Sequence, residues 1–115
     1  MPYIEGFIAA VPTANRDAYI EGAKQGAEYF KGLGATRVFE CWGDDVPHGE
    51  VTDFYRATQA KDDETVIFSW IEYPDKETRD SANEKMRADP DMANMEMPFD
   101  MKRMFWGGFE QIVGE

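Results

Sequence analysis

The sequence has 115 residues, of which 43% are hydrophobic and 14% aromatic, so a core can form without disulfides or metal staples. Acidic residues outnumber basic ones by 23 to 12, and the formal net charge of −11 repels nucleic-acid phosphates and anionic lipid headgroups. We therefore exclude nucleic acid and membrane surfaces as partners. No apolar run approaches the roughly 18 residues of a membrane span, and the amino-terminal residues carry no signal-peptide pattern, so we expect a cytoplasmic protein.

The first half of the chain predicts a strand, a helix and a second strand. β-branched and aromatic residues over 3–11 indicate a strand that is apolar on both faces, with Glu5 as the exception. The helix is expected to begin after Thr13 or Asn15 and to stop at Gly32. Residues 36–43 then read as the second strand.

The second half predicts a hairpin, a charged helix and a last strand. Residues 51–58 look extended and pair in our interpretation with 65–73, where apolar residues alternate most clearly. Pro74 ends that strand and Asp75 can cap a helix, which Pro90 closes. An irregular turn or a single helical turn is expected over 91–97, before a strand within 97–113.

The order of these elements is that of the split βαβ, ferredoxin-like fold, an α+β architecture in one domain spanning residues 1–115. Both helices would cover one face of an antiparallel sheet. The other face would carry large apolar residues that nothing in the chain covers, and such a face marks an interface. A second copy related by two-fold symmetry is the simplest cover, so we predict a homodimer through the open sheet face.

Three stretches carry a family resemblance: ECWGDDVP at 40–47, KDDETVIFSWIEYP at 61–74 and MPFDMKRMFWGGF at 97–109. They resemble the YbaA-like family of uncharacterised bacterial proteins, and the likeness covers nearly the whole chain in order. The resemblance implies the ferredoxin-like fold of the dimeric α/β-barrel superfamily, whose members include cofactor-free monooxygenases, isomerases and haem enzymes. It implies no particular reaction. The chain departs from the family pattern at Met101 and Trp106, where smaller residues are usual, and bulkier walls there would narrow a pocket.

The loop at 44–50 offers Asp44, Asp45, His48 and Glu50 as oxygen and imidazole ligands. Their spacing matches no metal motif, so we interpret the loop as a solvated turn and expect no metal. His48 is the single histidine and could act as a general base, but its place between a proline and a glycine favours an exposed side chain. The acidic neighbours of Cys41 favour a buried structural thiol over a nucleophile.

Charged and aromatic side chains within the strands supply the other candidates. A Glu–Arg pair can orient a polar substrate, or the strand charges can pair at edges or across a dimer. The aromatic residues can line a ligand pocket or pack in the core and the dimer. Trp106 is predicted to lie in the interior, either in the dimer layer or as a pocket wall, on the same face of its strand as Met104. The glycines Gly107 and Gly108 suggest a bulge or a close approach. The residues that we single out for ligand binding are Glu40, Trp42, Asp44, His48, Trp70, Arg103, Phe105 and Trp106.

Two functions remain open on the sequence. The first is a protein with a small-molecule site between the sheet and the helices. Such a protein could be a cofactor-independent oxygenase or isomerase. No context for haem ligation and no phosphate-cradling loop is visible, so we expect no cofactor. The second is a non-catalytic structural or accessory dimer, in which the same residues are core. A deep pocket with converging polar groups would favour the first.

Overall fold

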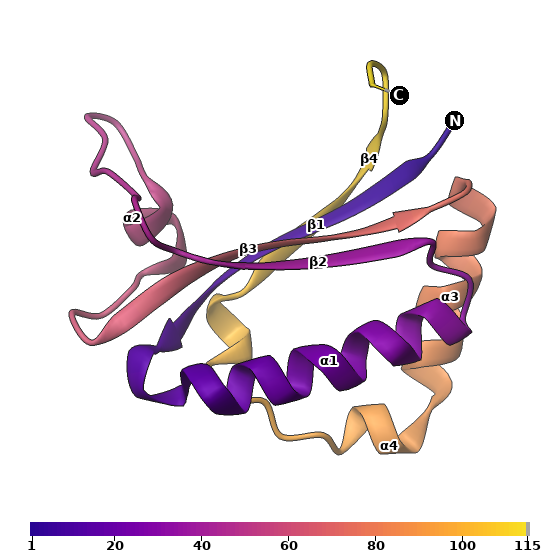
Figure 1. The fold of residues 1–115 in the computed structure, drawn as a ribbon, viewed down its shortest axis with the longest axis horizontal. Coiled ribbons are helices and arrows are strands. Elements are labelled where there is room, and N and C mark those ends of the chain that lie inside the picture. Colours follow the sequence, from indigo (N-terminus) through magenta and orange to yellow (C-terminus); the bar gives the residue numbers. More distant parts are fainter. Residues whose placement is uncertain (115) are drawn as a thin grey trace.

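The computed structural model describes residues 1–114, which form one antiparallel sheet with helices packed on one side of it (Figure 1). The strands, in the spatial order β2-β3-β1-β4, are β1 (Tyr3–Pro12), β2 (Arg37–Trp42), β3 (Glu64–Tyr73) and β4 (Phe105–Glu110). The α-helices are α1 (Arg16–Gly32), α2 (Phe54–Thr58), α3 (Lys76–Ala88) and α4 (Pro90–Ala93). Two 3-10 turns, Thr13–Asn15 and Met101–Arg103, precede α1 and β4.

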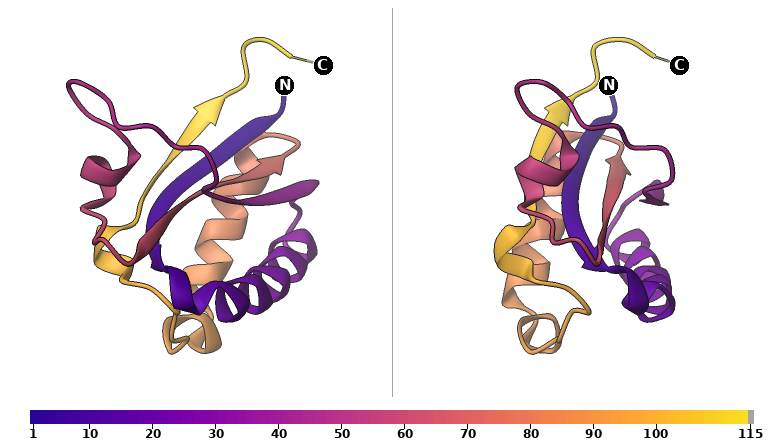
Figure 2. Two further views of the ribbon diagram at one scale, coloured as in Figure 1. Left: turned by 60° about the vertical axis from the view of Figure 1, so that its left-hand side comes forward. Right: turned by 90° about the vertical axis from the view of Figure 1, so that its left-hand side faces the viewer.

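This arrangement confirms the predicted α+β, ferredoxin-like fold. Helices α1, α3 and α4 all lie on one side of the sheet, and α2 with its loop rises on the other side (Figures 1 and 2). Asp75 caps α3 as expected, because its side chain accepts the backbone N–H of Thr78 at 2.7 Å. The expected single helical turn after Pro90 is α4. Within residues 1–114 no helix is long and apolar enough to cross a membrane.

The register of the sheet decides which residues face the helices. Position 5 of β1 pairs with position 71 of β3 and position 108 of β4, and the side chains alternate from there. The helix-facing residues include Ala9, Val11, Ile67, Ile71 and Tyr73, all buried. The opposite face, which we call the open face, carries Phe68, Trp70, Phe105 and Phe109.

Two sequence predictions about local structure are wrong. Residues 51–58 form no strand, because Asp53 accepts the backbone N–H of Arg56 at 2.7 Å and starts helix α2 there. The side chain of Arg56 then holds the loop by donating to the carbonyl oxygens of Gly49 and Val51. Cys41 is not a buried thiol: its position in β2 places it on the open face, where it is exposed.

Candidate functional site

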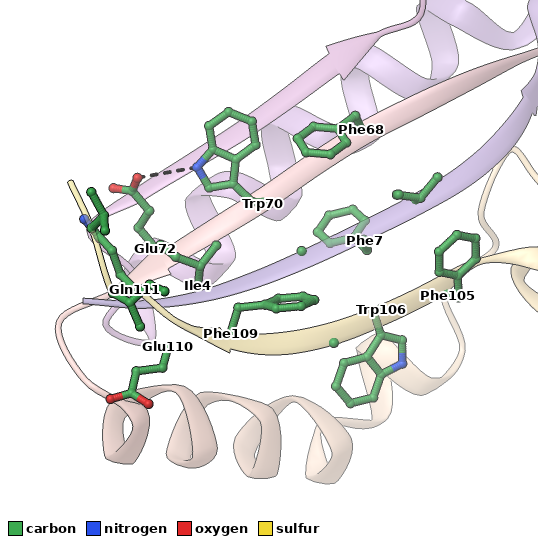
Figure 3. Close-up of a pocket in the computed structure, with 15 residues that line it drawn as sticks. Ile4, Phe7, Phe68, Trp70, Glu72, Phe105, Trp106, Phe109, Glu110 and Gln111 are labelled. Atoms are coloured by element: carbon green, nitrogen blue, oxygen red, sulfur yellow. Dashed lines mark hydrogen bonds between the residues drawn. The ribbon is translucent and has the colours of Figure 1, made fainter. Parts of the chain in front are cut away.

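Each face of the sheet carries a hollow with an almost entirely apolar wall. A further hollow of about 410 Å³ lies beside α1 and is lined by Tyr19, Glu40 and Trp42 among others. The first apolar hollow is the aromatic groove on the open face, with a volume of about 720 Å³. Its walls are the rings of β3 and β4 and the aliphatic side chains of β1, and residues 110–113 border it (Figure 3). The side chains that define the aromatic groove are Ile4, Phe68, Trp70, Phe105 and Phe109.

The aromatic groove has little polar chemistry to offer. Glu72 lies at its border, where it accepts from the indole N–H of Trp70 at 3.4 Å (Figure 3). The guanidinium of Arg37 pairs with the same carboxylate at 2.6 Å and lowers the pKa of Glu72. No other polar group converges on the rings from the described residues that line the groove, except Glu110 and Gln111 at its end. The aromatic groove is therefore suited to packing against another apolar surface.

The second hollow, which we call the α3 pocket, lies between the sheet and helices α3 and α4 and has a volume of about 260 Å³. Its apolar wall comes from both layers of the fold, with Phe7 and Ile71 on the sheet and methionines opposite them. The methionines are Met86, Met92, Met101 and Met104. Three residues with polar side chains, Glu5, Asn83 and Arg87, complete the lining together with Trp106 and with Phe30 of α1. An apolar cavity with a few polar groups is the usual form of a small-molecule site.

The polar wall of the α3 pocket is built around the carboxylate of Glu5, which is 7% exposed. One of its oxygens, Oε1, accepts from Arg79 Nε at 3.0 Å and from Asn83 Nδ2 at 2.9 Å. Arg79 and Asn83 lie one helical turn apart on α3, so a single helix face delivers both donors. A buried carboxylate needs such partners to keep its charge. Glu5 Oε2 has no hydrogen-bond partner among the described residues.

A glycine in the edge strand makes room for this network. A side chain at Gly108 would collide with Arg79 Nη2, and with the hydroxyl of Tyr3 at 2.5 Å. The guanidinium of Arg79 lies over the rings of Tyr3 and Trp106, at 5.1 and 5.9 Å from their centroids. The predicted close approach at this glycine is therefore confirmed, and the group that approaches is the cation that neutralises Glu5.

Tyr73 adds a second buried polar group on the same face of the sheet. Its hydroxyl is buried and has no hydrogen-bond partner among residues 1–114. Burial, with the nearby charge of Glu5 as a second cause, raises the pKa of Tyr73 to about 12. The phenol therefore stays protonated at neutral pH.

The structure does not bring the eight predicted site residues together. Trp70 of β3 and Phe105 of β4, two of the predicted ligand-binding residues, lie in the aromatic groove. Trp106 shares a strand face with Met104 as expected and forms part of the α3 pocket wall. The prediction that Trp106 is buried is wrong for a single protomer, because the residue is 55% exposed. β4 is an edge strand, and no helix reaches far enough to cover the ring.

Glu40 and Trp42 face α1 on the other half of the sheet. Oε1 of Glu40 accepts from the hydroxyl of Tyr19 at 2.6 Å and from the hydroxyl of Ser69. Burial and the carboxylate of Glu40 together raise the pKa of Tyr19. Trp42 packs against the Tyr19 ring with centroids 6.1 Å apart. These contacts satisfy the polar groups beneath α1 and join them to the core.

The remaining three candidates lie outside both hollows. Asp44 is exposed in the loop before α2, and His48 in the same loop stacks on Tyr55 with its Nδ1 3.5 Å from Asp53. Arg103 pairs with both oxygens of Glu64, at 2.6 and 2.7 Å, and so fastens the segment before β4 to β3. Within residues 1–114, no group of three or more His, Cys, Asp or Glu residues lies together in a way that could hold a metal ion.

Sequence reasoning missed Arg79 and Asn83 as site residues. The signal was present in two parts: a lone acidic residue, Glu5, in an apolar strand, and a basic and an amide residue at i and i+4 on a helix with few apolar positions. Joining these parts needs the packing of α3 on β1, which no local pattern contains.

Comparisons with known proteins agree on a family. Residues 2–101 match the model of a family described as "Protein of unknown function (DUF1428)". The uncharacterized protein YbaA of Escherichia coli strain K12 is 55% identical over 117 residues, covering 100% of both chains, and the protein of the same name from Shigella flexneri matches equally well. A dimeric ferredoxin-like protein from an uncultured marine organism has a related structure, with a TM-score of 0.61, 13% identity and full coverage of both chains. The chain therefore belongs to the DUF1428 family of YbaA-like proteins.

Proposed function

We propose that this chain acts as a homodimer, with two sheets packed face to face, in which each protomer binds one small molecule in its α3 pocket. The observation that carries the proposal is the buried Glu5 carboxylate, neutralised by Arg79, in the wall of a mainly apolar cavity. A fold whose only task is packing gains little by burying a charged pair there, because the cost of removing two charges from water offsets their attraction. A binding site gains polar groups held in fixed positions.

The exposed surface of the chain supports the dimer. A folded monomer of 13.2 kDa exposes about 6,400 Å² by the usual scaling with mass. This chain exposes 7834 Å², an excess of about 1,400 Å². A standard protein interface buries about 800 Å² on each partner.

A second copy fits the open face better than a small molecule does. The aromatic groove runs over three strands, and its side chains are 42–60% exposed at Phe68, Phe105 and Phe109. Exposed apolar side chains also lie at each end of the aromatic groove: Val51 in the α2 loop is 91% exposed, and Val113 is 84% exposed. Two-fold symmetry would place these ends against the partner. The related ferredoxin-like protein is described as dimeric, which supports the same assembly here.

An enzymatic role of the α3 pocket is the alternative, as a cofactor-independent isomerase or oxygenase. It is favoured by Glu5 Oε2, which has no hydrogen-bond partner among the described residues and can accept a proton from a bound substrate. In that case the protein should speed the exchange of the α-hydrogens of 2-octanone for deuterium, and a Glu5→Gln variant should lose this effect. We also propose a cytoplasmic location, supported by the exposed thiol of Cys41, which a reducing compartment keeps reduced.

Two measurements test the proposal. Light scattering at micromolar concentration should give the mass of a dimer, and a monomer mass would contradict the assembly. Titration calorimetry with 1-octanol, a neutral apolar probe, should give one site per chain. A Met92→Trp variant should fill the α3 pocket and abolish the heat. Met95→Trp is the matched control, because Met95 is 45% exposed and outside the pocket. A dimer that binds no probe would support the accessory role instead.

A further inference from the structure

We propose that the ligand of the α3 pocket is a singly charged anionic amphiphile, with its apolar body among the methionines and a carboxylate at Arg87. This inference rests on the proposed function, because it names the ligand class of the same pocket. Its basis is the charge of the lining, the shape of the apolar wall and the acidic residues outside the mouth.

The charge of the pocket leaves one cation uncompensated. Glu5 is paired with Arg79, whose Nη1 also pairs with Asp80 at 2.9 Å. Arg87 is the cation of the lining itself, and within residues 1–114 none of the ion pairs includes its exposed side chain. A guanidinium has two parallel N–H groups that match the two oxygens of a carboxylate.

The inner part of the pocket fits a flexible apolar chain. Methionine side chains are unbranched and polarisable, so four of them around one cavity adapt to ligands of different shape. At about 30 Å³ for each water molecule, a volume of 260 Å³ holds the equivalent of about nine waters. A chain of about eight carbon atoms is of this size.

The mouth of the pocket limits the charge of the head group. An outer hollow of about 410 Å³ adjoins this mouth and shares Asn83, Arg87 and Trp106 with the α3 pocket. Asp80 and Glu84 line that outer hollow, and Asp80 is paired with Lys76 and Arg79. Glu84 would repel a head group that carries two charges, such as a phosphate monoester. A single carboxylate can reach Arg87 without adding a second charge near Glu84.

Titration calorimetry of octanoate against 1-octanol tests the inference, since the two probes share a chain and differ in head group. We expect octanoate to bind about tenfold more tightly, as a charge-assisted hydrogen bond allows. Arg87→Gln should remove this preference, so that the ratio of the two affinities falls to about one. Lys85→Gln is the matched control, since it removes the same charge from α3 at a residue outside the pocket lining. Met92→Trp should abolish binding of both probes.

The outcomes separate this inference from the proposed function. Equal affinity for the two probes, or a preference that persists in Arg87→Gln, would overturn the anionic ligand class while the pocket stands. Absence of binding by both probes, or binding that Met92→Trp leaves intact, would overturn the pocket itself and the inference with it. A preference lost equally in Lys85→Gln would assign the effect to the overall charge of the protein and also overturn the role of Arg87.

Discussion

The two faces of the sheet differ in how far the chain itself covers them and in where a buried charge lies. The helix-covered face combines small and aliphatic residues, such as Ala9 and Val11, with buried rings such as Tyr73, and it includes the charged group of Glu5. The open face is lined by aromatic rings and has no such buried ion pair among its described residues. Small residues let helices lie close to a sheet, whereas exposed rings give a large area for a separate partner to bury. The proposed function accordingly divides the two faces, with ligand binding beneath the helices and assembly on the open face.

The largest effect should come from placing a charge on the open face. Phe109 and Trp106 lie on the same strand, on opposite faces, and are 60% and 55% exposed. Phe109→Asp should weaken the dimer by about 4 kcal/mol or more, because two-fold symmetry places the charge in the interface twice. Trp106→Asp should leave the dimer intact. Light scattering over a concentration series measures both, and equal effects would mean that the interface is not the open face.

Removal of the buried carboxylate should have the next largest effect. Glu5→Ala leaves the guanidinium of Arg79 partly unpaired under the helix layer, and we expect a loss of about 3–5 kcal/mol in the free energy of unfolding. Lys76→Ala, which breaks an exposed pair with Asp80, should cost less than about 1 kcal/mol. Urea unfolding at one fixed protein concentration compares the variants, because the stability of a dimer depends on concentration. Similar losses would show that Glu5 is hydrated.

A methyl group at Gly108 should have a smaller cost. The added carbon would overlap Arg79, which Glu5 holds in place, and the hydroxyl of Tyr3, whose ring lies against the Arg79 guanidinium. Gly108→Ala should therefore destabilise the fold by about 1–3 kcal/mol. Gly22→Ala is the contrasting variant, because nothing lies within 4 Å of the added carbon in the middle of α1. It should stabilise the fold by up to about 1 kcal/mol. Thermal unfolding of the two variants should move in opposite directions.

The smallest expected effect is a pH dependence of the α2 loop. The backbone N–H of Arg56, with further hydrogen bonds from Gly49 and the Arg56 guanidinium, lowers the pKa of Asp53 from 3.8 to about 2. Because the folded-state pKa is depressed, the stabilisation is complete above about pH 4 and is lost as the pH falls through 2. Asp53→Asn should therefore be less stable than the parent at pH 6 and equal to it near pH 2. A constant difference across this range would contradict the assignment.

The sequence was sufficient for the fold because its strongest patterns are local. Alternating residues over 65–73, the stop at Pro74 and the cap at Asp75 each depend on a few neighbours. The α2 helix has only five residues, which are too few to show a helical period. The sequence signal for its start was Asp53, whose side chain caps the helix. Arg79 and Asn83 reach Glu5 across more than 70 positions of sequence, so no local pattern joined them. Alternation placed Trp106 on the correct face, but burial depends on how far α3 extends over the edge strand.

The three tryptophans occupy three different environments. Trp42 packs beneath α1, Trp70 lies in the aromatic groove and Trp106 stands at the mouth of the α3 pocket. Indole emission shifts to the blue when water leaves the ring. Three variants, each of which keeps one tryptophan, would thus report three events separately. The emission of Trp70 would follow dimer formation, that of Trp106 would follow ligand entry, and that of Trp42 would follow loss of the core.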